Sequence, residues 1–423
     1  MDRIEILGTA LFALAVLHTF VASYFVRFSH RFPKGSGREA FFHLLGEVEV
    51  VFGFWAAILM LILAIMESPQ FAISYQESLD FTEPLFVFCI MVVAATKPLL
   101  QAARGFIARM GALLAKILKL PQAPADIFVI LTLGPLSGSL ITEPAAMTVT
   151  ALLLAAMIRK PEKRFMYFLL GTLFVNVSIG GALTHFAAPP ILMVAGKWEW
   201  GLGYVFSHFG WKSLLAVTLN SLIFVGLNFR KIQDCCQSLN EKEDMVSSSS
   251  WWVAVTHLGF LVGLVLTSHY KSTMMGIFLF FLGFTAVTRK YQSGLRFRES
   301  LLVAFFLGGI VMFGGFQRWW LEPILTTLEP GILYLAATAL TAITDNAALT
   351  FLGSQVPHLS EAAKYFLVAG AIAGGGLTVI ANAPNAAGYS VLQKFLPNGL
   401  NSGALFVGAL IPTLVAVLAL GLL

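Results

Sequence analysis

The sequence predicts an all-α polytopic membrane protein, and its composition and the layout of its apolar residues carry this prediction. Of its 423 residues, 58% are hydrophobic and only 12% are charged, and the mean hydropathy is +0.82. A soluble domain is about one quarter charged, so a chain with half that share cannot cover a water-facing surface. The apolar residues also form long runs, and a transmembrane helix needs about 20 of them. We therefore exclude a soluble enzyme and a disordered scaffold.

The apolar runs predict about ten transmembrane helices. The first run, residues 6–28, is too long for the apolar region of a signal peptide and its basic residues follow it, so we interpret it as a span. The other runs lie at 46–66, 84–101, 165–196, 211–229, 251–268, 272–288, 299–316, 361–393 and 403–423. Two further apolar segments, 126–158 and 331–356, are interrupted in the middle by polar residues.

The distribution of Lys and Arg predicts which loops are cytoplasmic, because cytoplasmic loops carry an excess of these residues. Residues 27–38 and 97–119 are basic, whereas residues 67–83 contain four acidic residues and no Lys or Arg. In the topology that follows, 21 of the 27 Lys and Arg residues are cytoplasmic, and both chain termini lie outside. The +5 net charge is explained by this bias, so we expect no nucleic-acid partner.

Both interrupted segments begin and end on the same side in this topology. Segment 126–158 is flanked by basic loops, so both of its ends are expected in the cytoplasm. Its two arms are each too short to cross the membrane comfortably at 1.5 Å per helical residue. We therefore predict re-entrant hairpins at 126–158, open to the cytoplasm, and at 331–356, open to the outside.

A hydrophilic cytoplasmic linker at 230–250 divides the chain into two halves, 1–229 and 251–423, that repeat each other. Residues 141–148 read ITEPAAMT and residues 343–350 read ITDNAALT, with five of the eight positions identical. A second match, GGALT at 180–184 and GGGLT at 374–378, lies in runs 165–196 and 361–393, which we expect to be broken helices.

The predicted topology gives these halves opposite orientations. The first half begins outside and the second begins inside, so the repeats are inverted. Paired, interrupted segments in inverted halves are typical of secondary transporters, and they indicate where the substrate binds. Close packing of small residues explains scattered glycines, but it does not explain an acid-bearing octapeptide that occurs twice.

The paired breaks predict a cation and proton site. Non-helical backbone at membrane depth occurs where it is buried in protein or lines a watery cavity. Asp345 is our first candidate and Glu143 the second, because a buried carboxylate can hold either H⁺ or Na⁺. The expected neutral ligands at the hairpin breaks are Asn346, Thr344 and Thr142, with Thr148 and Thr350 behind them. The expected lining from the broken helices is Thr184, His185, Thr378, Asn382 and Asn385.

Other ionisable groups in the apolar runs are weaker candidates. Glu47 and Glu49 lie near the cytoplasmic start of the second span, where they could give protons access to the site or simply pair with arginine. His185 has Val379 as its counterpart in the second half, so it could be a ligand or a proton relay. Three Cys residues give neither a metal-ligand spacing nor a disulfide framework, so we expect no cofactor other than the transported Na⁺ and H⁺.

The sequence favours a transporter over an enzyme. We find no His-Glu-x-x-His, Gly-x-Ser-x-Gly or Gly-x-Gly-Asp motif and no phosphate-binding loop with its lysine, which argues against an intramembrane enzyme and an ATP-driven pump. Proteolysis that needs Asp345 would favour the enzyme. Exchange of a monovalent cation for protons is the leading hypothesis. The alternative is Na⁺-coupled transport of an inorganic or carboxylate anion, and broken hairpins also occur in channels.

The Thr344-Asp345-Asn346 tip resembles the Asp-Asn motif in the sodium/proton antiporter and arsenite-efflux branches of the ion transporter superfamily. Over roughly residues 40–423, the chain is most similar to a family of Na⁺/H⁺ antiporters within it. The resemblance implies a homodimer in which the hairpin-bearing domain moves against a fixed scaffold, in an elevator motion. It also implies a multi-pass protein of the bacterial inner membrane. The tip Thr142-Glu143-Pro144 departs from the Ser-Asn-Thr tips of the dicarboxylate carriers, which weakens the anion alternative.

Overall fold

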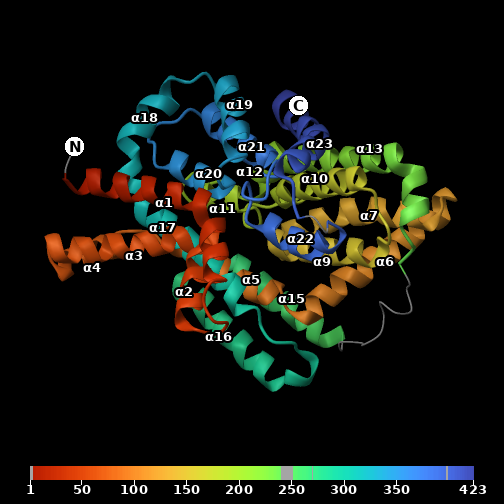
Figure 1. The fold of residues 1–423 in the computed structure, drawn as a ribbon, viewed down its shortest axis with the longest axis horizontal. Helices are drawn as coiled ribbons and strands as arrows, with labels where there is room; N and C mark the ends of the chain where they lie inside the picture. Colours follow the sequence, from red (N-terminus) through yellow and green to blue (C-terminus); the bar gives the residue numbers. More distant parts are fainter. Residues whose placement is uncertain (1–2, 240–250, 269, 397–398) are drawn as a thin grey trace. The chain divides into compact units, whose positions relative to one another are not determined.

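The computed structural model describes residues 3–239, 251–268, 270–396 and 399–423. Over these ranges the chain is almost entirely helical and contains no strand, which confirms the predicted all-α class (Figure 1). The residues form two compact units. One unit comprises Met1–Cys89, Arg296–Thr327 and Phe351–Leu359, and the other comprises Ile90–Leu295, Leu328–Thr350 and Ser360–Leu423. Each unit takes segments from both predicted repeats.

In the first unit, α3 packs against α17 and α1 packs against both α3 and α2. Phe52 of α3 contacts Phe306 of α17 edge to face, with 5.4 Å between the ring centroids. Glycines allow the close approach, since a Cβ on Gly309 would lie 2.4 Å from the backbone of α3. The helices of this unit are α1 (Arg3–Ser29), α2 (Gly37–Leu45), α3 (Val48–Met66), α4 (Pro69–Glu77), α17 (Phe297–Gly314), η4 (Gly315–Gln317) and α18 (Arg318–Thr327).

The second unit contains the remaining helices. They are α6 (Lys97–Leu118), α7 (Gln122–Leu136), α8 (Gly138–Ile141), α9 (Glu143–Met157), α10 (Lys163–Gly180), η1 (Gly181–Leu183), α11 (Pro189–Ala195), α12 (Leu202–Val205), η2 (Phe206–Gly210), α13 (Trp211–Cys235), α15 (Trp251–Leu266), α16 (Lys271–Val287), η3 (Arg289–Tyr291), α19 (Pro330–Thr341), α21 (Glu361–Gly374), α22 (Pro384–Leu392), η5 (Gln393–Phe395) and α23 (Ser402–Leu422). Two of the boundaries between the units fall inside helices, α5 (Thr82–Ala94) and α20 (Asn346–Ser354), and the others fall between helices.

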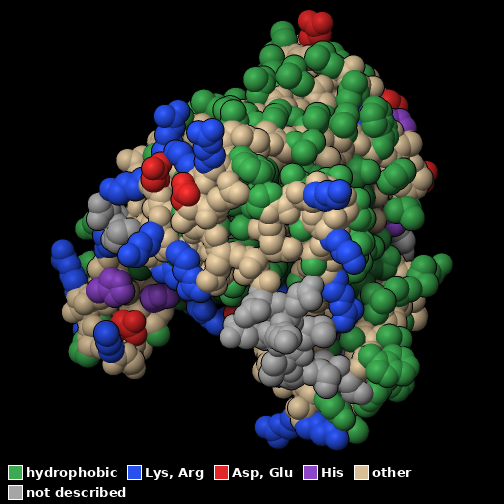
Figure 2. Space-filling view, turned by 90° about the vertical axis from the view of Figure 1, so that its right-hand side faces the viewer, with side chains coloured by type: hydrophobic (Ala, Val, Ile, Leu, Met, Phe, Trp, Pro, Cys, Tyr) green, Lys and Arg blue, Asp and Glu red, His purple; other side chains and the backbone are tan. Residues whose placement is uncertain are grey.

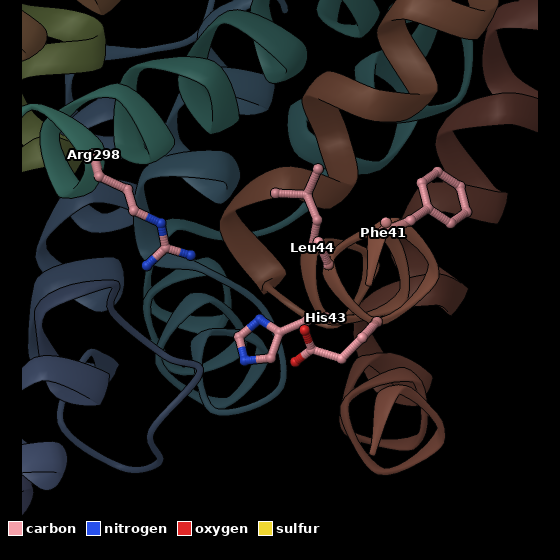
Figure 3. Close-up of a pocket in the computed structure, with 7 residues that line it drawn as sticks. Phe41, His43, Leu44 and Arg298 are labelled. Carbon is pink, nitrogen blue, oxygen red and sulfur yellow. The ribbon is translucent and has the colours of Figure 1, made fainter. Parts of the chain in front are cut away.

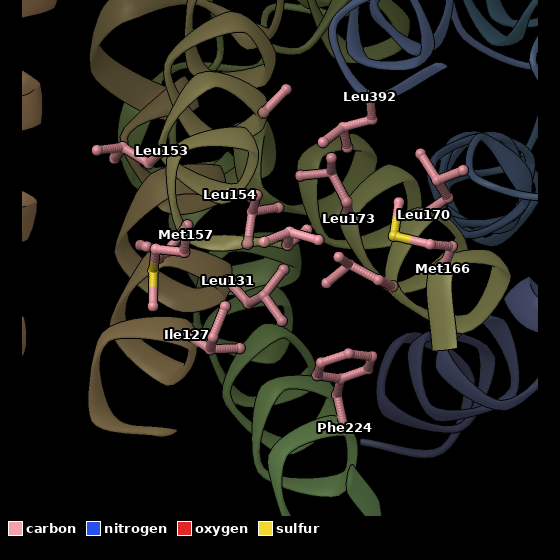
Figure 4. Close-up of a cluster of buried hydrophobic side chains, with 14 of the residues drawn as sticks. Ile127, Leu131, Leu153, Leu154, Met157, Met166, Leu170, Leu173, Phe224 and Leu392 are labelled. Carbon is pink, nitrogen blue, oxygen red and sulfur yellow. The ribbon is translucent and has the colours of Figure 1, made fainter. Parts of the chain in front are cut away.

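A hydrophobic core in the second unit holds α7, α9, α10, α13 and α22 together. Figure 4 shows Leu131 of α7, Leu154 of α9, Leu173 of α10 and Phe224 of α13 converging on one another. All four side chains are at most 1% exposed. This core fixes the helices whose ends carry the candidate site.

Helix breaks occur at all four predicted positions. Segment 126–158 breaks at Thr142, between α8 and α9, and segment 331–356 breaks between α19 and α20. Run 165–196 loses its helix between η1 and α11, and run 361–393 loses it between α21 and α22. Gly or Pro at three of these places explains the interruption, because Pro cannot continue a helix that precedes it and Gly weakens a helix interior. Residues 342–345, between α19 and α20, contain neither. The inverted orientation and the re-entrant path of the hairpins remain predictions.

Two helices extend beyond the predicted spans. Residues 97–118, which the charge pattern places in a cytoplasmic loop, form the helix α6. Its basic residues are separated by an apolar stripe that includes Ile107, Gly111 and Ala115, and this stripe is buried. Helix α13 continues to Cys235, six residues into the predicted linker. The linker residues 240–250 lie outside the described part of the chain.

The protein is a multi-pass membrane protein. Within the described ranges, six helices are long and apolar enough to cross a membrane, and counting each of two bent pairs as one span gives up to eight. Helices α15 and α16, with 16 and 17 residues, are apolar but shorter, so the predicted ten spans remain a prediction. In Figure 2, hydrophobic side chains gather over the upper and right-hand parts of the face, and Lys and Arg lie mostly over its left-hand and lower parts.

Candidate functional site

The first hairpin break places Glu143 in the protein interior. Thr142 has φ +70° and ψ 152°, a conformation that non-glycine residues rarely adopt, and it turns the chain between α8 and α9. Pro144 in the first turn of α9 prevents the preceding residues from joining the same helix. The carboxyl group of Glu143 therefore sits at the first turn of a new helix, and the residue is 0% exposed.

The acid at the second hairpin break, Asp345, caps the helix that follows it. Asp345 precedes α20, and its Oδ1 accepts hydrogen bonds from the backbone N–H groups of Ala347 at 2.8 Å and Ala348 at 3.1 Å. This is the geometry of a helix N-cap, in which the side chain satisfies N–H groups that have no partner inside the helix. Asp345 is also only partly buried, whereas the adjacent Asn346 is 0% exposed.

A hydrogen bond joins the two halves of the chain at the site. Asn382, in the broken run 361–393, donates from Nδ2 to Glu143 Oε2 over 2.7 Å, and both residues are fully buried. Asp345 is near enough to Glu143 for the two carboxyl groups to interact electrostatically. The structure thus brings together Glu143, Asn382 and Asp345, three of the predicted site residues.

Glycines of the broken helices make room for the polar tips of the hairpins. A Cβ on Gly181 would lie 2.7 Å from Glu143 Oε1, and a Cβ on Gly375, its match in the second half, would lie 2.8 Å from Asn346 Nδ2. Both distances are shorter than van der Waals contact, so these approaches require glycine. The sequence predicts breaks at these glycines but does not indicate which side chains approach them.

Matched threonines make the same hydrogen bond in each half. Thr184 donates from Oγ1 to the carbonyl oxygen of Ser139 over 2.8 Å, and Thr378 donates to that of Ala342 over 2.8 Å. Both acceptors lie just before the hairpin tips. The two predicted lining threonines therefore attach each broken helix to the hairpin of its own half.

Several buried polar atoms at the site have no hydrogen-bond partner within the described part of the chain. They are Thr142 Oγ1, Glu143 Oε1, Asn346 Oδ1 and Nδ2, Asn382 Oδ1 and Asn385 Oδ1. Most buried polar atoms in proteins are hydrogen-bonded, so such a group is typical of a place that receives a ligand or water. Five of the six atoms are oxygens, and oxygen ligands suit a hard cation.

Some predicted residues have other roles. Asn385 donates to the carbonyl oxygens of Gly375 at 2.7 Å and Thr378 at 2.8 Å, so it braces the broken backbone. The Thr344 hydroxyl donates to the carbonyl of Leu340 over 2.9 Å, within its own helix end. Thr148 and Thr350 likewise donate to backbone carbonyls one turn earlier. His185 is partly buried and stands edge to face with Phe186.

Glu47 belongs to the first unit, where it is paired with cations. Its Oε1 is bonded to Nη2 of Arg298 and lies 3.5 Å from Nδ1 of His43. His43 of α2 and Arg298 of α17 also line a pocket of about 630 Å³. Figure 3 shows these two side chains among those that line it. The arginine-paired interpretation of Glu47 therefore fits this geometry, and the side chain of Glu49 lies outside the described part of the chain.

A buried asparagine that the sequence analysis did not single out supports the first hairpin. Asn176 of α10 donates from Nδ2 to the carbonyl oxygen of Leu131 over 2.9 Å, and Pro135, four residues further along α7, has no N–H to offer it. Asn176 also accepts a hydrogen bond from Asn220 of α13 at 2.9 Å. An Asn one turn before the Gly180 break, in an otherwise apolar run, is the signal that could have identified it.

Comparison with known proteins agrees with this architecture. Among curated proteins, no sequence matches the chain significantly. A family model described as "Putative Na+/H+ antiporter" matches residues 3–423, nearly the whole chain. This description is of a transporter family and not of an enzyme family, in line with the interrupted helices and the buried carboxyl group. The chain belongs to this antiporter family.

Proposed function

We propose that the protein exchanges a monovalent cation, Na⁺ first among them, for protons, and that Glu143 is the group that holds either ion. One observation carries the proposal: Glu143 is fully buried, is bonded to Asn382, and lies among buried oxygens without partners. The family supports the same class of reaction.

The burial of Glu143 makes two ions compete for one place. An ionised carboxylate in an apolar interior is costly unless a positive charge accompanies it. The charged group that acts on Glu143 is another carboxyl group, Asp345, which adds to that cost. A proton or a cation must therefore be present, and binding one displaces the other. This competition is the minimum that exchange requires.

Asp345 takes second place in this proposal, although the sequence places it first. Its Oδ1 is occupied as the N-cap of α20, and the residue is only partly buried. Its carboxyl group adds negative charge beside the ion that Glu143 holds. A negative site of this kind also disfavours the anion alternative, because it would repel a carboxylate substrate.

Alternating access is the proposed route. Glu143, Asn382, Asp345 and Asn346 all belong to one compact unit, so the site could move across the membrane as a body in an elevator motion. We further propose a homodimer in the bacterial inner membrane with both termini outside. The bias of Lys and Arg among the loops supports that orientation.

Transport in sealed proteoliposomes tests the function. With a pH-sensitive dye inside, an imposed Na⁺ gradient should move protons in the opposite direction, and parallel runs with Li⁺ and K⁺ give the selectivity. Glu143→Gln should abolish the proton movement, while Glu162→Gln, at an exposed loop residue, should leave it intact. Wild-type exchange by Glu143→Gln would refute the assignment, and Na⁺-stimulated anion flux without proton movement would favour the anion alternative.

A further inference from the structure

A pair of adjacent thiols lies at the end of α13, away from the site described above. The Sγ atoms of Cys235 and Cys236 are 3.6 Å apart. Cys235 is the last residue of the helix and Cys236 is already extended, with φ −123° and ψ 141°. This change of conformation lets two neighbouring side chains converge, which neither a regular helix nor a regular strand allows.

These cysteines belong to a short segment, residues 235–239, that we call the clasp because it binds both ends of the first hairpin. At the α9 end, Cys236 pairs with Ile158 in an antiparallel bridge, and Gln237 N donates to the carbonyl of Met157 over 2.9 Å. At the α7 end, Leu239 N donates to Asp126 Oδ2 over 3.1 Å. The hairpin held in this way is the one that carries Glu143.

We propose that Cys235 and Cys236 form a dithiol site for soft, trivalent thiophiles of the organoarsenical class. Two thiolates bonded to one pyramidal As(III) atom, at about 2.3 Å per bond and about 100° between the bonds, lie roughly 3.5 Å apart, close to the 3.6 Å found here. The described residues contain no group of three or more His, Cys, Asp or Glu side chains that could hold a metal ion. A ligand that needs only two sulfurs therefore fits, whereas Zn²⁺, which needs four ligands, does not.

The two thiols can react with a trivalent arsenical without any oxidant. A phenylarsonous acid carries two hydroxyl groups and one phenyl group on arsenic. Each thiol gives up its proton, two S–As bonds form, two As–O bonds break, and two water molecules leave. Cys236 is 8% exposed and Cys235 is partly exposed, while Asp234 and Gln237 on either side are exposed, so the reagent can approach from this side.

Intact-mass measurement of the purified full-length protein, treated with phenylarsine oxide, tests the site. We expect one phenylarsenic group per chain, which excess glutathione does not remove and 2,3-dimercaptopropanol does. Cys235→Ser and Cys236→Ser should each lose the stable adduct, and Cys89→Ser, at a fully buried thiol of the first unit, should keep it. No adduct on the wild-type protein, or an equally stable adduct on Cys235→Ser, would overturn the proposal.

The clasp predicts a second readout, which rests on the proposed exchange function. The adduct should slow exchange in proteoliposomes, because it ties together residues that hold the end of α9, and Cys235→Ser should be insensitive. Adduct formation with unchanged exchange would refute control through α9. The mass measurement does not depend on transport, so a failure of the exchange function and a failure of the dithiol site are distinguishable.

Discussion

Glu143 and Asn382 form a hydrogen bond between two fully buried side chains of the site. The amide of Asn382 donates this bond to the carboxyl group over 2.7 Å. A hydrogen bond to a charged group contributes about 1.5–3 kcal/mol, more than one between neutral groups. At the scale of single residues, this contact decides how readily the carboxylate accepts a cation.

Asn382→Leu should weaken the binding of Na⁺. Losing the amide donor from an ionised carboxylate corresponds to roughly a tenfold to hundredfold rise in the KM for Na⁺, at about 1.4 kcal/mol per factor of ten. The rise is measured as the Na⁺ dependence of proton movement in proteoliposomes. Asn401→Ala, which removes an exposed cap from α23, is the control. An unchanged KM would show that the bond does not act on the ion.

Gly181→Ala should inactivate the transporter. The added Cβ would lie 2.7 Å from Glu143 Oε1, so the carboxyl group has to move, and such overpacking costs about 1–3 kcal/mol. Gly226→Ala in α13 is the matched control, because a Cβ there would meet nothing within 4 Å. We expect exchange to be lost in the first variant and kept in the second. Equal activities would contradict the close approach.

At the scale of elements, the broken helices depend on side chains that replace missing backbone donors. Pro135 leaves the carbonyl of Leu131 without its helical partner, and Asn176 supplies the donor. Asn176 is fully buried and is itself bonded to Asn220, which also donates to the carbonyl of Pro412 in α23. The two asparagines together thus connect α7, α10, α13 and α23.

Asn176→Leu should destabilise the protein more than it changes its affinity for ions. It leaves the buried carbonyl of Leu131 without a donor, at about 1–3 kcal/mol for an unsatisfied group, and it removes one of the two acceptors of the Asn220 amide. The midpoint of thermal unfolding in detergent should fall clearly below that of wild type. Thr218→Ala, at an exposed hydroxyl of α13, should leave the midpoint unchanged. An unaltered midpoint in Asn176→Leu would refute this structural role.

The loop between α9 and α10 predicts a small dependence of stability on pH. The Lys231 ammonium, 2.7 Å from Glu162, lowers the pKa of that carboxyl group through a hydrogen bond and its charge. Because the folded pKa is the lower one, the pair contributes stability above the unfolded pKa, about 4.3, and loses it as pH falls through the folded value.

Lys231→Met tests this sign. The unfolding midpoint of wild type should exceed that of the variant slightly at pH 7, and the difference should vanish once the pH falls below the lowered pKa of Glu162. Both side chains are well exposed, so the difference should be small and should shrink in high salt. A difference that grows as the solution is acidified would have the wrong sign for this pair.

The sequence predicts where the helices break better than it predicts which side chains meet at each break. Gly and Pro are local signals, so the breaks near Thr142 and after Gly181 could be located without a structure. The sequence could not rank Glu143 above Asp345 as the ion-binding acid, because both acids occupy the same position in the repeated octapeptide. Burial and the Asn382 bond separate them, and both depend on residues more than 200 positions apart. Helix α6 was missed because its charges resemble a loop, while its buried stripe faces α7.

At the scale of the whole molecule, the two compact units do not follow the two repeats. Each unit combines segments from before and after the linker, and the candidate site draws Glu143 from one half and Asn382 from the other. Comparing the sequences of the two halves could identify the repeat, but it could not show that each compact unit is built from segments of both halves. Which segments pack together depends on contacts between distant parts of the chain, and no local pattern encodes them.

The inverted topology predicts opposite accessibility for the two hairpins. A cysteine at Lys160, beyond the end of α9, should be cytoplasmic, and one at His358, beyond the end of α20, should face outside. In intact cells, a membrane-impermeant maleimide should label His358→Cys and not Lys160→Cys, and both should react after permeabilisation. Labelling of both in intact cells would contradict the inverted arrangement.

Competition between Na⁺ and H⁺ for Glu143 is the central claim, and calorimetry of Na⁺ binding tests it most directly. Titration of the purified protein in two buffers with different ionisation enthalpies gives the number of protons released for each Na⁺ bound. We predict a release close to one proton per Na⁺ for wild type at a pH where Glu143 is protonated, and none for Glu143→Gln. Na⁺ binding without proton release in wild type, or equal release in the variant, would contradict the account.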